Sequence, residues 1–102
     1  MSLVVIKLVD SDKLREFYGA EDTVAMAKEF LAQGLYDEVA NFFFNETGET
    51  AAEEAFDFTN NPCRQYERNK YYGRGRSVSV GDIVEVDGVN FLCSSFGWKE
   101  LA

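Results

Sequence analysis

The chain has 102 residues, of which 46% are hydrophobic and 27% are charged, and it contains no histidine. This length corresponds to one domain, and the hydrophobic content is too high for a disordered chain. No apolar run approaches the roughly 18 residues of a membrane-spanning helix, and the N-terminus lacks the basic segment of a secretory signal peptide. We therefore expect a single domain over residues 1–102 that is cytoplasmic and has no membrane partner.

The net charge of −8 is distributed unevenly. Residues 1–60 hold four basic and thirteen acidic residues, whereas residues 61–76 hold five basic residues against Glu67 alone. A negative field repels nucleic acid, because phosphate neutralisation supplies most of the affinity in such complexes. Binding of nucleic acid by the whole domain is therefore not expected, and only the basic segment remains as a contact.

The sequence begins with an apolar, β-branched run. Residues 3–9 read Leu-Val-Val-Ile-Lys-Leu-Val and end at Asp-Ser-Asp, which predicts a strand covered on both faces. Ser11 or Asp12 then caps a short helical turn over residues 13–17.

The clearest helix lies over residues 23–33. Apolar residues recur there at helical spacing, and Asp22 opens the segment. Gly34 stands where a left-handed C-terminal cap belongs, which predicts that Leu35 lies over Phe30.

Residues 36–44 fit two structures. Their aromatic residues, which include three consecutive Phe, suit a second helix or a buried strand. We favour the strand because Asn-Glu-Thr-Gly follows as a turn and a new helix begins at once, over residues 49–60. Thr50 and Glu53 have the spacing of a capping box in that helix, and Pro62 ends it.

The segment 63–76 differs from the rest in charge and pattern. It shows neither helical nor strand periodicity, so we expect a flexible basic loop. Loops of this length in small domains are often functional.

The strongest β pattern lies near the C-terminus. Residues 83–86 and 89–92 alternate around Asp-Gly, the signal of a type I′ hairpin. The two-residue loop pairs Val86 with Val89 and places Cys93 on the apolar face. A final short strand is expected within residues 96–101. The elements together predict an α+β fold, with two or three helices packed on a small, mostly antiparallel sheet that includes the C-terminal β-hairpin.

The absence of histidine excludes several kinds of site. A Ser/His/Asp or Cys/His catalytic arrangement cannot form, nor can a zinc site with a histidine ligand. Cys63 and Cys93 lack zinc-ligand spacing. We expect Cys93 to be a buried apolar side chain and Cys63 to be an inert thiol in the sense that it is not a catalytic nucleophile. A disulfide between the two cysteines is possible if they meet in the fold.

Two charged clusters could bind partners. The first is an acidic helix face, which fits either a solvated surface or a face for a basic partner, and holds Glu49, Glu53, Glu54 and Asp57. The second has the composition of a single-strand nucleic-acid contact and holds Arg64, Arg68, Lys70, Tyr71, Tyr72, Arg74 and Arg76. We favour a different role for the second cluster, in which its cations neutralise the acids of the domain itself. Neither cluster predicts a metal site or a cofactor.

Three segments resemble a known group of proteins. They are Ala55–Asn61, the Arg-Ser-Val-Ser-Val-Gly-Asp run at 76–82, and the Ser-Phe-Gly-Trp run at 95–98. In this pattern the chain resembles small accessory proteins of phages, plasmids and conjugative elements, of which the YodL-like domains are one branch. The match covers residues 36–101, but Trp98 stands where Phe or Tyr is usual, and the basic insert is longer. The resemblance implies a mobile-element origin and carries over no activity and no site residue.

The sequence therefore predicts a non-enzymatic accessory binding protein of a phage or mobile element. It would act in the host cytoplasm by contacting a host or viral protein, and its acidic helices could act as a nucleic-acid mimic. The alternative is a nucleic-acid-binding module that uses residues 64–76. A carboxylate-based, Mg²⁺-dependent hydrolase or nuclease is the third and least favoured class.

Overall fold

The N-terminal strand is the centre of the molecule. In the computed structural model, which describes residues 1–101, a five-stranded antiparallel sheet has the order β2-β1-β3-β4-β5. The strands are β1 (Ser2–Val9), β2 (Tyr36–Phe44), β3 (Ile83–Val86), β4 (Val89–Ser94) and β5 (Gly97–Leu101). The helices are η1 (Ser11–Phe17), α1 (Thr23–Ala32), α2 (Gly48–Asn60), η2 (Pro62–Arg64) and α3 (Gln65–Tyr71), where η marks a 3-10 helix. The α+β class is confirmed.

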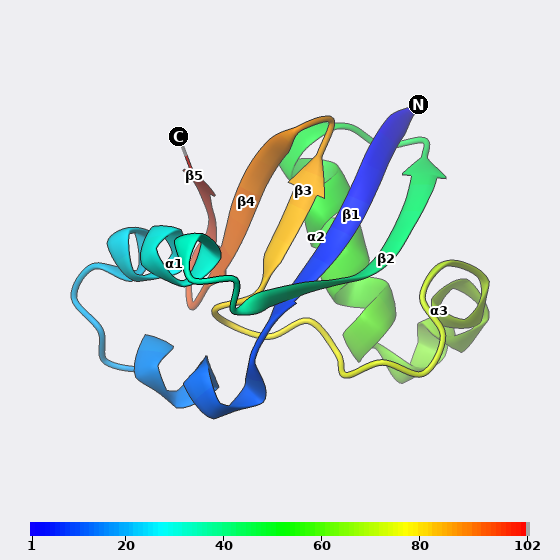
Figure 1. Cartoon of the computed structure of the whole chain (residues 1–102). Helices are drawn as coiled ribbons and strands as arrows, with labels where there is room; N and C mark the ends of the chain where they lie inside the picture. Colours follow the sequence, from blue (N-terminus) through cyan, green and yellow to red (C-terminus); the bar gives the residue numbers. More distant parts are fainter. Residues whose placement is uncertain (102) are drawn as a thin grey trace.

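The sheet is covered on both faces, which explains the continuous apolar run of β1. On one face Val4 and Ile6 pack with Phe58 of α2, and on the other Val9 packs with Phe30 of α1. Figure 1 shows α2 behind the sheet and α1 in front of it, near β4 and β5. The sheet therefore separates two apolar cores, one on each of its faces.

The expected strand over residues 36–44 is confirmed as β2, an edge strand. Phe42 and Phe44 point toward α2, whereas Phe43 between them is 64% exposed. The register shifts opposite Ile6 and Lys7, so that Val39 forms a β-bulge. The three consecutive Phe thus follow strand alternation and are not all buried.

The helix predicted over residues 23–33 is confirmed, with Ala32 as its last residue. The Asp22 side chain accepts a hydrogen bond from the Ala25 N–H, and the Leu35 N–H donates to the Phe30 carbonyl at 3.0 Å across Gly34. This is the expected C-terminal cap.

Two helix caps differ from expectation. Asp10, and neither Ser11 nor Asp12, caps the first turn, because its side chain accepts from the Asp12 N–H and the 3-10 helix begins one residue after it. The prediction that Thr50 and Glu53 form a capping box is wrong. Helix α2 begins earlier, at Gly48, so these two residues lie inside the helix. Its end at Asn60, before Pro62, is as predicted.

The segment 63–76 differs from the expected irregular loop. It begins within η2, and α3 then takes up seven of its residues. The helix is held by tertiary contacts: the Tyr71 ring lies 4.9 Å from the Phe42 ring and 5.6 Å from the Phe58 ring, between centroids. Because one aromatic side chain makes these contacts, the sequence of α3 shows no repeating apolar pattern.

The C-terminal hairpin has the predicted register. Val86 pairs with Val89 and Ile83 with Leu92, and Asp87 at the turn has a φ of 50°. A second hairpin joins β4 to β5 and confirms the expected last strand. No helix within residues 1–101 has the length and apolar character to cross a membrane.

Two glycines test how closely the chain is packed. Gly81 has a φ of +100°, and a Cβ there would lie 2.5 Å from the Phe17 ring, whereas Gly88 has a φ of +86° with open space around it. We expect Gly88→Ala to cost about 1 kcal/mol through backbone strain, and Gly81→Ala to cost about 3 kcal/mol because a steric clash is added. Urea unfolding measures both, and equal losses would show that Phe17 moves aside freely.

Candidate functional site

The segment 76–82 contains a buried ion pair. The Asp82 carboxylate is fully buried and accepts from the Val9 N–H at 2.9 Å and the Ser79 N–H at 2.7 Å. Both terminal nitrogens of Arg76 donate to it, at 2.7 and 3.0 Å, and one also donates to the Val9 carbonyl. The carboxylate raises the pKa of Arg76. We call this arrangement the Arg76–Asp82 clasp.

The other residues of the same segment also bond within the fold. The Ser77 hydroxyl donates to the Thr59 carbonyl at 2.6 Å, and the main chain of Asp82 accepts from the Cys93 N–H at 2.9 Å. Gly81 lies against Phe17. The polar groups that make this segment recognisable therefore join β1, α2 and β4.

The acidic face of α2 is partly neutralised. Arg64 donates to Asp57 at 2.9 Å and to Glu54 at 3.1 Å, and it also pairs with Glu67. These hydrogen bonds, led by the one to Glu67, raise the pKa of Arg64, and the same contact lowers the pKa of Glu67. Of the four acids expected on this face, Glu49 and Glu53 remain outside the Arg64 cluster.

The basic-aromatic cluster is spread over several environments. Arg64 and Arg76 are engaged as described above. The Arg68 guanidinium lies 5.1 Å from the Tyr72 ring centroid, and the Tyr72 hydroxyl donates to the Arg76 carbonyl at 2.5 Å. Burial raises the pKa of Tyr72.

Three residues of that cluster remain. Tyr71 belongs to the α2-side core, while Lys70 and Arg74 are exposed. The Lys70 ammonium lies 5.1 Å from the Tyr71 ring centroid. The cluster therefore does not form one continuous surface of cations and stacking rings.

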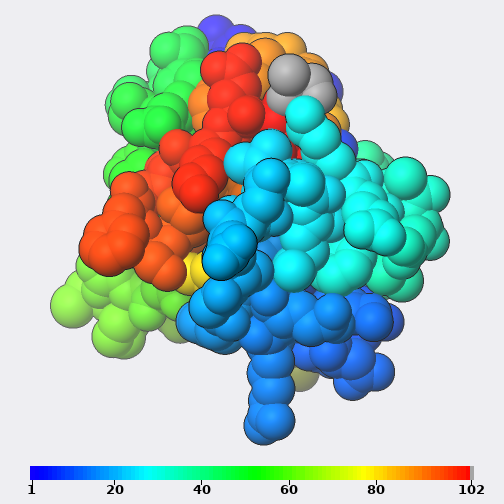
Figure 2. Space-filling model, turned by 90° about the vertical axis from the view of Figure 1, so that its left-hand side faces the viewer, coloured from blue at the N-terminus to red at the C-terminus, as the bar shows by residue number. Residues whose placement is uncertain are grey.

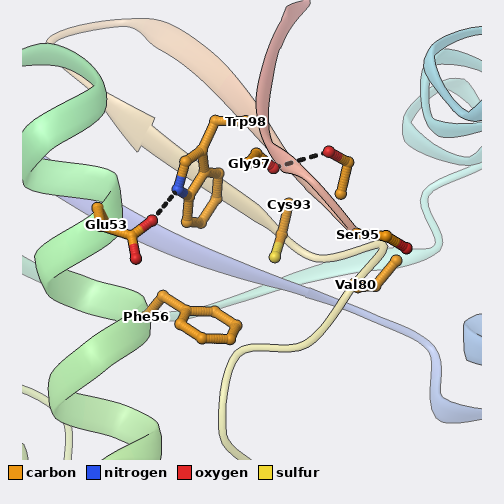
Figure 3. Close-up of a pocket in the computed structure, with 8 residues that line it drawn as sticks. Glu53, Phe56, Val80, Cys93, Ser95, Gly97 and Trp98 are labelled. Carbon is orange, nitrogen blue, oxygen red and sulfur yellow. Dashed lines mark hydrogen bonds between the residues drawn. The ribbon is translucent and has the colours of Figure 1, made fainter.

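A hollow of about 260 Å³ lies between α2 and the β4–β5 hairpin. Figure 3 shows Trp98, Phe56 and the Cys93 sulfur along its wall. The two rings are 6.4 Å apart in an edge-to-face arrangement. Its lining comes from α2, β4, β5 and the turn segments, and consists of Glu53, Phe56, Val80, Cys93, Ser94, Ser95, Gly97 and Trp98. We call it the Trp98 hollow.

Glu53 and Trp98 hold each other in place at this hollow. The indole Nε1–H of Trp98 donates to Oε2 of Glu53 at 2.7 Å. The second carboxylate oxygen, Oε1, has no hydrogen-bond partner within residues 1–101. The acid is therefore oriented, and one of its oxygens is left available.

A second hollow, of about 320 Å³, adjoins the first around the β4–β5 turn. Val80, Ser94, Ser95 and Trp98 line both. Phe96 borders the second hollow and is fully exposed. Figure 2 shows the turn, in orange, projecting at the edge of the molecule, with the segment near residue 80, in yellow, recessed beside it.

Sequence reasoning assigned residues 96–101 to a strand and missed this surface. The register of β4 and β5 places Ser95 and Phe96 in a two-residue turn, a position usually taken by Gly, Asn or Asp. The sequence signal that could have indicated the exposed turn was a large aromatic residue between a serine and a glycine. Within residues 1–101 no group of three His, Cys, Asp or Glu is arranged to hold a metal ion.

The buried thiol predicts a difference in reactivity between the two cysteines, which are both free. Burial raises the pKa of Cys93 to about 12, so at pH 8 its thiolate fraction is negligible, whereas Cys63 is exposed. We expect a disulfide reagent to modify one thiol per native chain quickly and the second roughly a thousandfold more slowly, or only after unfolding. Cys63→Ser should abolish the fast phase and Cys93→Ala should keep it. Two fast thiols in the native protein would contradict the assignment.

The Arg76–Asp82 clasp predicts a large effect of a small substitution. Asp82→Asn removes the buried charge and places amide hydrogens against donors, so we expect a loss of about 3 kcal/mol in the free energy of unfolding. Asp22→Asn is the matched control, since an exposed asparagine caps a helix almost as well as aspartate. It should cost a few tenths of a kcal/mol by the same urea measurement. Similar losses for the two variants would show that the clasp adds little stability.

Comparison of the chain with protein-family models, curated proteins and solved structures finds no match in any of the three. The resemblance to mobile-element accessory proteins therefore stays a prediction. What the protein does is inferred from the geometry of its surface.

Proposed function

We propose that this chain is a non-enzymatic binding protein that contacts another protein through the β4–β5 turn. The observation that carries the proposal is Phe96, whose side chain is fully exposed at the end of a two-residue turn. Aromatic side chains supply most of the energy in protein interfaces when they become buried there. A short turn also restricts the backbone that carries the ring, so little backbone entropy is lost on binding.

The surroundings of Phe96 support an interface. The two hollows lie next to each other around the turn, and Trp98 lines both of them. Recesses beside a projecting aromatic ring allow a partner to interdigitate its side chains, which is typical of the well-packed centre of an interface. We call Phe96, Trp98 and the two hollows the turn surface.

The turn surface is a better candidate than either charged cluster. Arg64 already neutralises part of the acidic face of α2, which weakens a nucleic-acid mimic built on that face. The alternative of nucleic-acid binding through residues 64–76 has Lys70 and Arg74 as its exposed cations, and no specific observation favours it. The partner we propose is a host or viral protein in the host cytoplasm; that part of the proposal, with a mobile-element origin, is based on the sequence resemblance.

Substitution of Phe96 tests the proposal. The wild-type chain, Phe96→Ala and Phe43→Ala are immobilised and exposed to a lysate of the cell that naturally makes the protein, and the captured proteins are identified. We expect Phe96→Ala to lose at least one specific partner, with an affinity loss of roughly 30-fold for a 2 kcal/mol anchor. Phe43→Ala is the matched control, because Phe43 is also exposed but lies on β2, at the opposite edge of the sheet.

The outcome is decided by comparing the two variants. Partners that survive Phe43→Ala but not Phe96→Ala support the turn surface. Identical capture by all three chains, or a partner lost only with Phe43→Ala, contradicts it. Both variants should unfold at nearly the same urea concentration as the wild type, since neither ring belongs to a buried core.

A further inference from the structure

We propose that the Trp98 hollow binds an arginine side chain of the partner protein. The proposal rests on the proposed function, because it names the group that a partner docked on the turn surface would insert. The hollow unites two aromatic rings with one oriented carboxylate. A planar cation that stacks on one aromatic ring and donates hydrogen bonds in its own plane matches this combination.

The aromatic part of the hollow favours a cation. Figure 3 shows the side chains of Trp98 and Phe56 directed into the same space from β5 and α2. Tryptophan gives the strongest cation–π attraction of the natural side chains, and arginine is the cation found most often in such contacts. A volume of about 260 Å³ leaves room for a guanidinium group and the methylenes next to it.

The carboxylate of Glu53 supplies the charge. Its Oε2 accepts from the indole of Trp98 at 2.7 Å, and Oε1 is left for a donor from outside. A guanidinium N–H···O⁻ bond is among the stronger hydrogen bonds in proteins. A neutral apolar occupant would gain no such hydrogen bond from Oε1.

No positive charge competes inside the hollow. Its eight lining residues include neither lysine nor arginine, and the only thiol, Cys93, is neutral at physiological pH because burial raises its pKa to about 12. The hollow therefore carries the single negative charge of Glu53. The net charge of −8 adds a long-range field that attracts a basic segment and repels an acidic one.

The test uses the one tryptophan of the chain as its probe. The fluorescence of Trp98 is followed while the wild-type protein is titrated, at low salt, with the capped peptide acetyl-Gly-Arg-Gly-amide. We expect a saturable change with a dissociation constant of about 1–10 mM, the range of a single side chain in an open site. The peptide with citrulline, the neutral isostere of arginine, should give no saturable change. The lysine peptide should bind at least threefold more weakly than the arginine peptide.

A matched pair of variants locates the site. Glu53→Gln removes the charge but keeps an oxygen that accepts from the Trp98 indole, and it should weaken arginine-peptide binding at least fivefold. Glu38→Gln removes the same charge from β2, at the opposite edge of the sheet, and should leave the dissociation constant within twofold of the wild type. Equal effects of the two variants would mean that only net charge matters, and would overturn the site.

A second readout keeps the test decisive if Glu53→Gln folds poorly. The indole N–H of Trp98 gives one nuclear magnetic resonance signal, which should shift with the arginine peptide and not with the citrulline peptide. Phe56→Leu, which removes the second aromatic ring of the hollow, should reduce the affinity at least threefold. Binding of citrulline as tightly as arginine, or no shift of the indole signal, overturns the proposal.

The two experiments distinguish a failure of the proposed function from a failure of the proposed arginine site. If Phe96→Ala loses its partner but the arginine peptide does not bind, the turn surface stands and its hollow takes another group. If the arginine peptide binds as described but Phe96→Ala captures every partner, the hollow is a cation site outside the interface.

Discussion

The fold depends on one buried carboxylate. Asp82 stands just before β3, and its side chain and main chain together reach β1, β4 and the segment between α3 and β3. A buried charge without partners would be too costly to retain, and here it is matched by two backbone N–H groups and the guanidinium of Arg76. Because Arg76 also bonds the Val9 carbonyl, the end of the central strand and the start of the C-terminal hairpin are fixed by the same group.

The charged side chains differ in whether they pair within the fold. Arg64 and Arg76 are directed at the acids of the protein itself, so they strengthen the fold and add little to the outer field. Phe96 is the most exposed large hydrophobic side chain of the described residues. Its neighbour in the turn surface, Trp98, donates to Glu53, on a chain that is acidic overall. On α2, Glu54 and Asp57 are therefore neutralised within the fold by Arg64, whereas Glu53 pairs with the indole of Trp98.

Local patterns were predictable and long-range ones were not. The register of the hairpin around Asp87 was predicted correctly, because an Asp-Gly turn and strict alternation determine register within ten positions. The loop assigned to residues 63–76 missed α3, whose anchor, Tyr71, packs on rings from β2 and α2. The pairing of Glu53 with Trp98 joins residues 45 positions apart, and no periodicity in either segment encodes it. Both omissions arise where a contact is made by tertiary structure alone.

The order of strands in the sheet also determines when the domain can become complete. β1 is synthesised well before one of its two neighbours, β3, which begins at Ile83. A nascent chain that has not yet reached that residue can pair β1 with β2 but leaves the other side of β1 open, without the Asp82 carboxylate that bonds Val9. Contacts of such large sequence separation slow folding, because loop closure precedes any gain. The complete sheet therefore forms only after β3, β4 and β5 have left the ribosome, and until β3 is available one edge of the apolar strand β1 is unpaired.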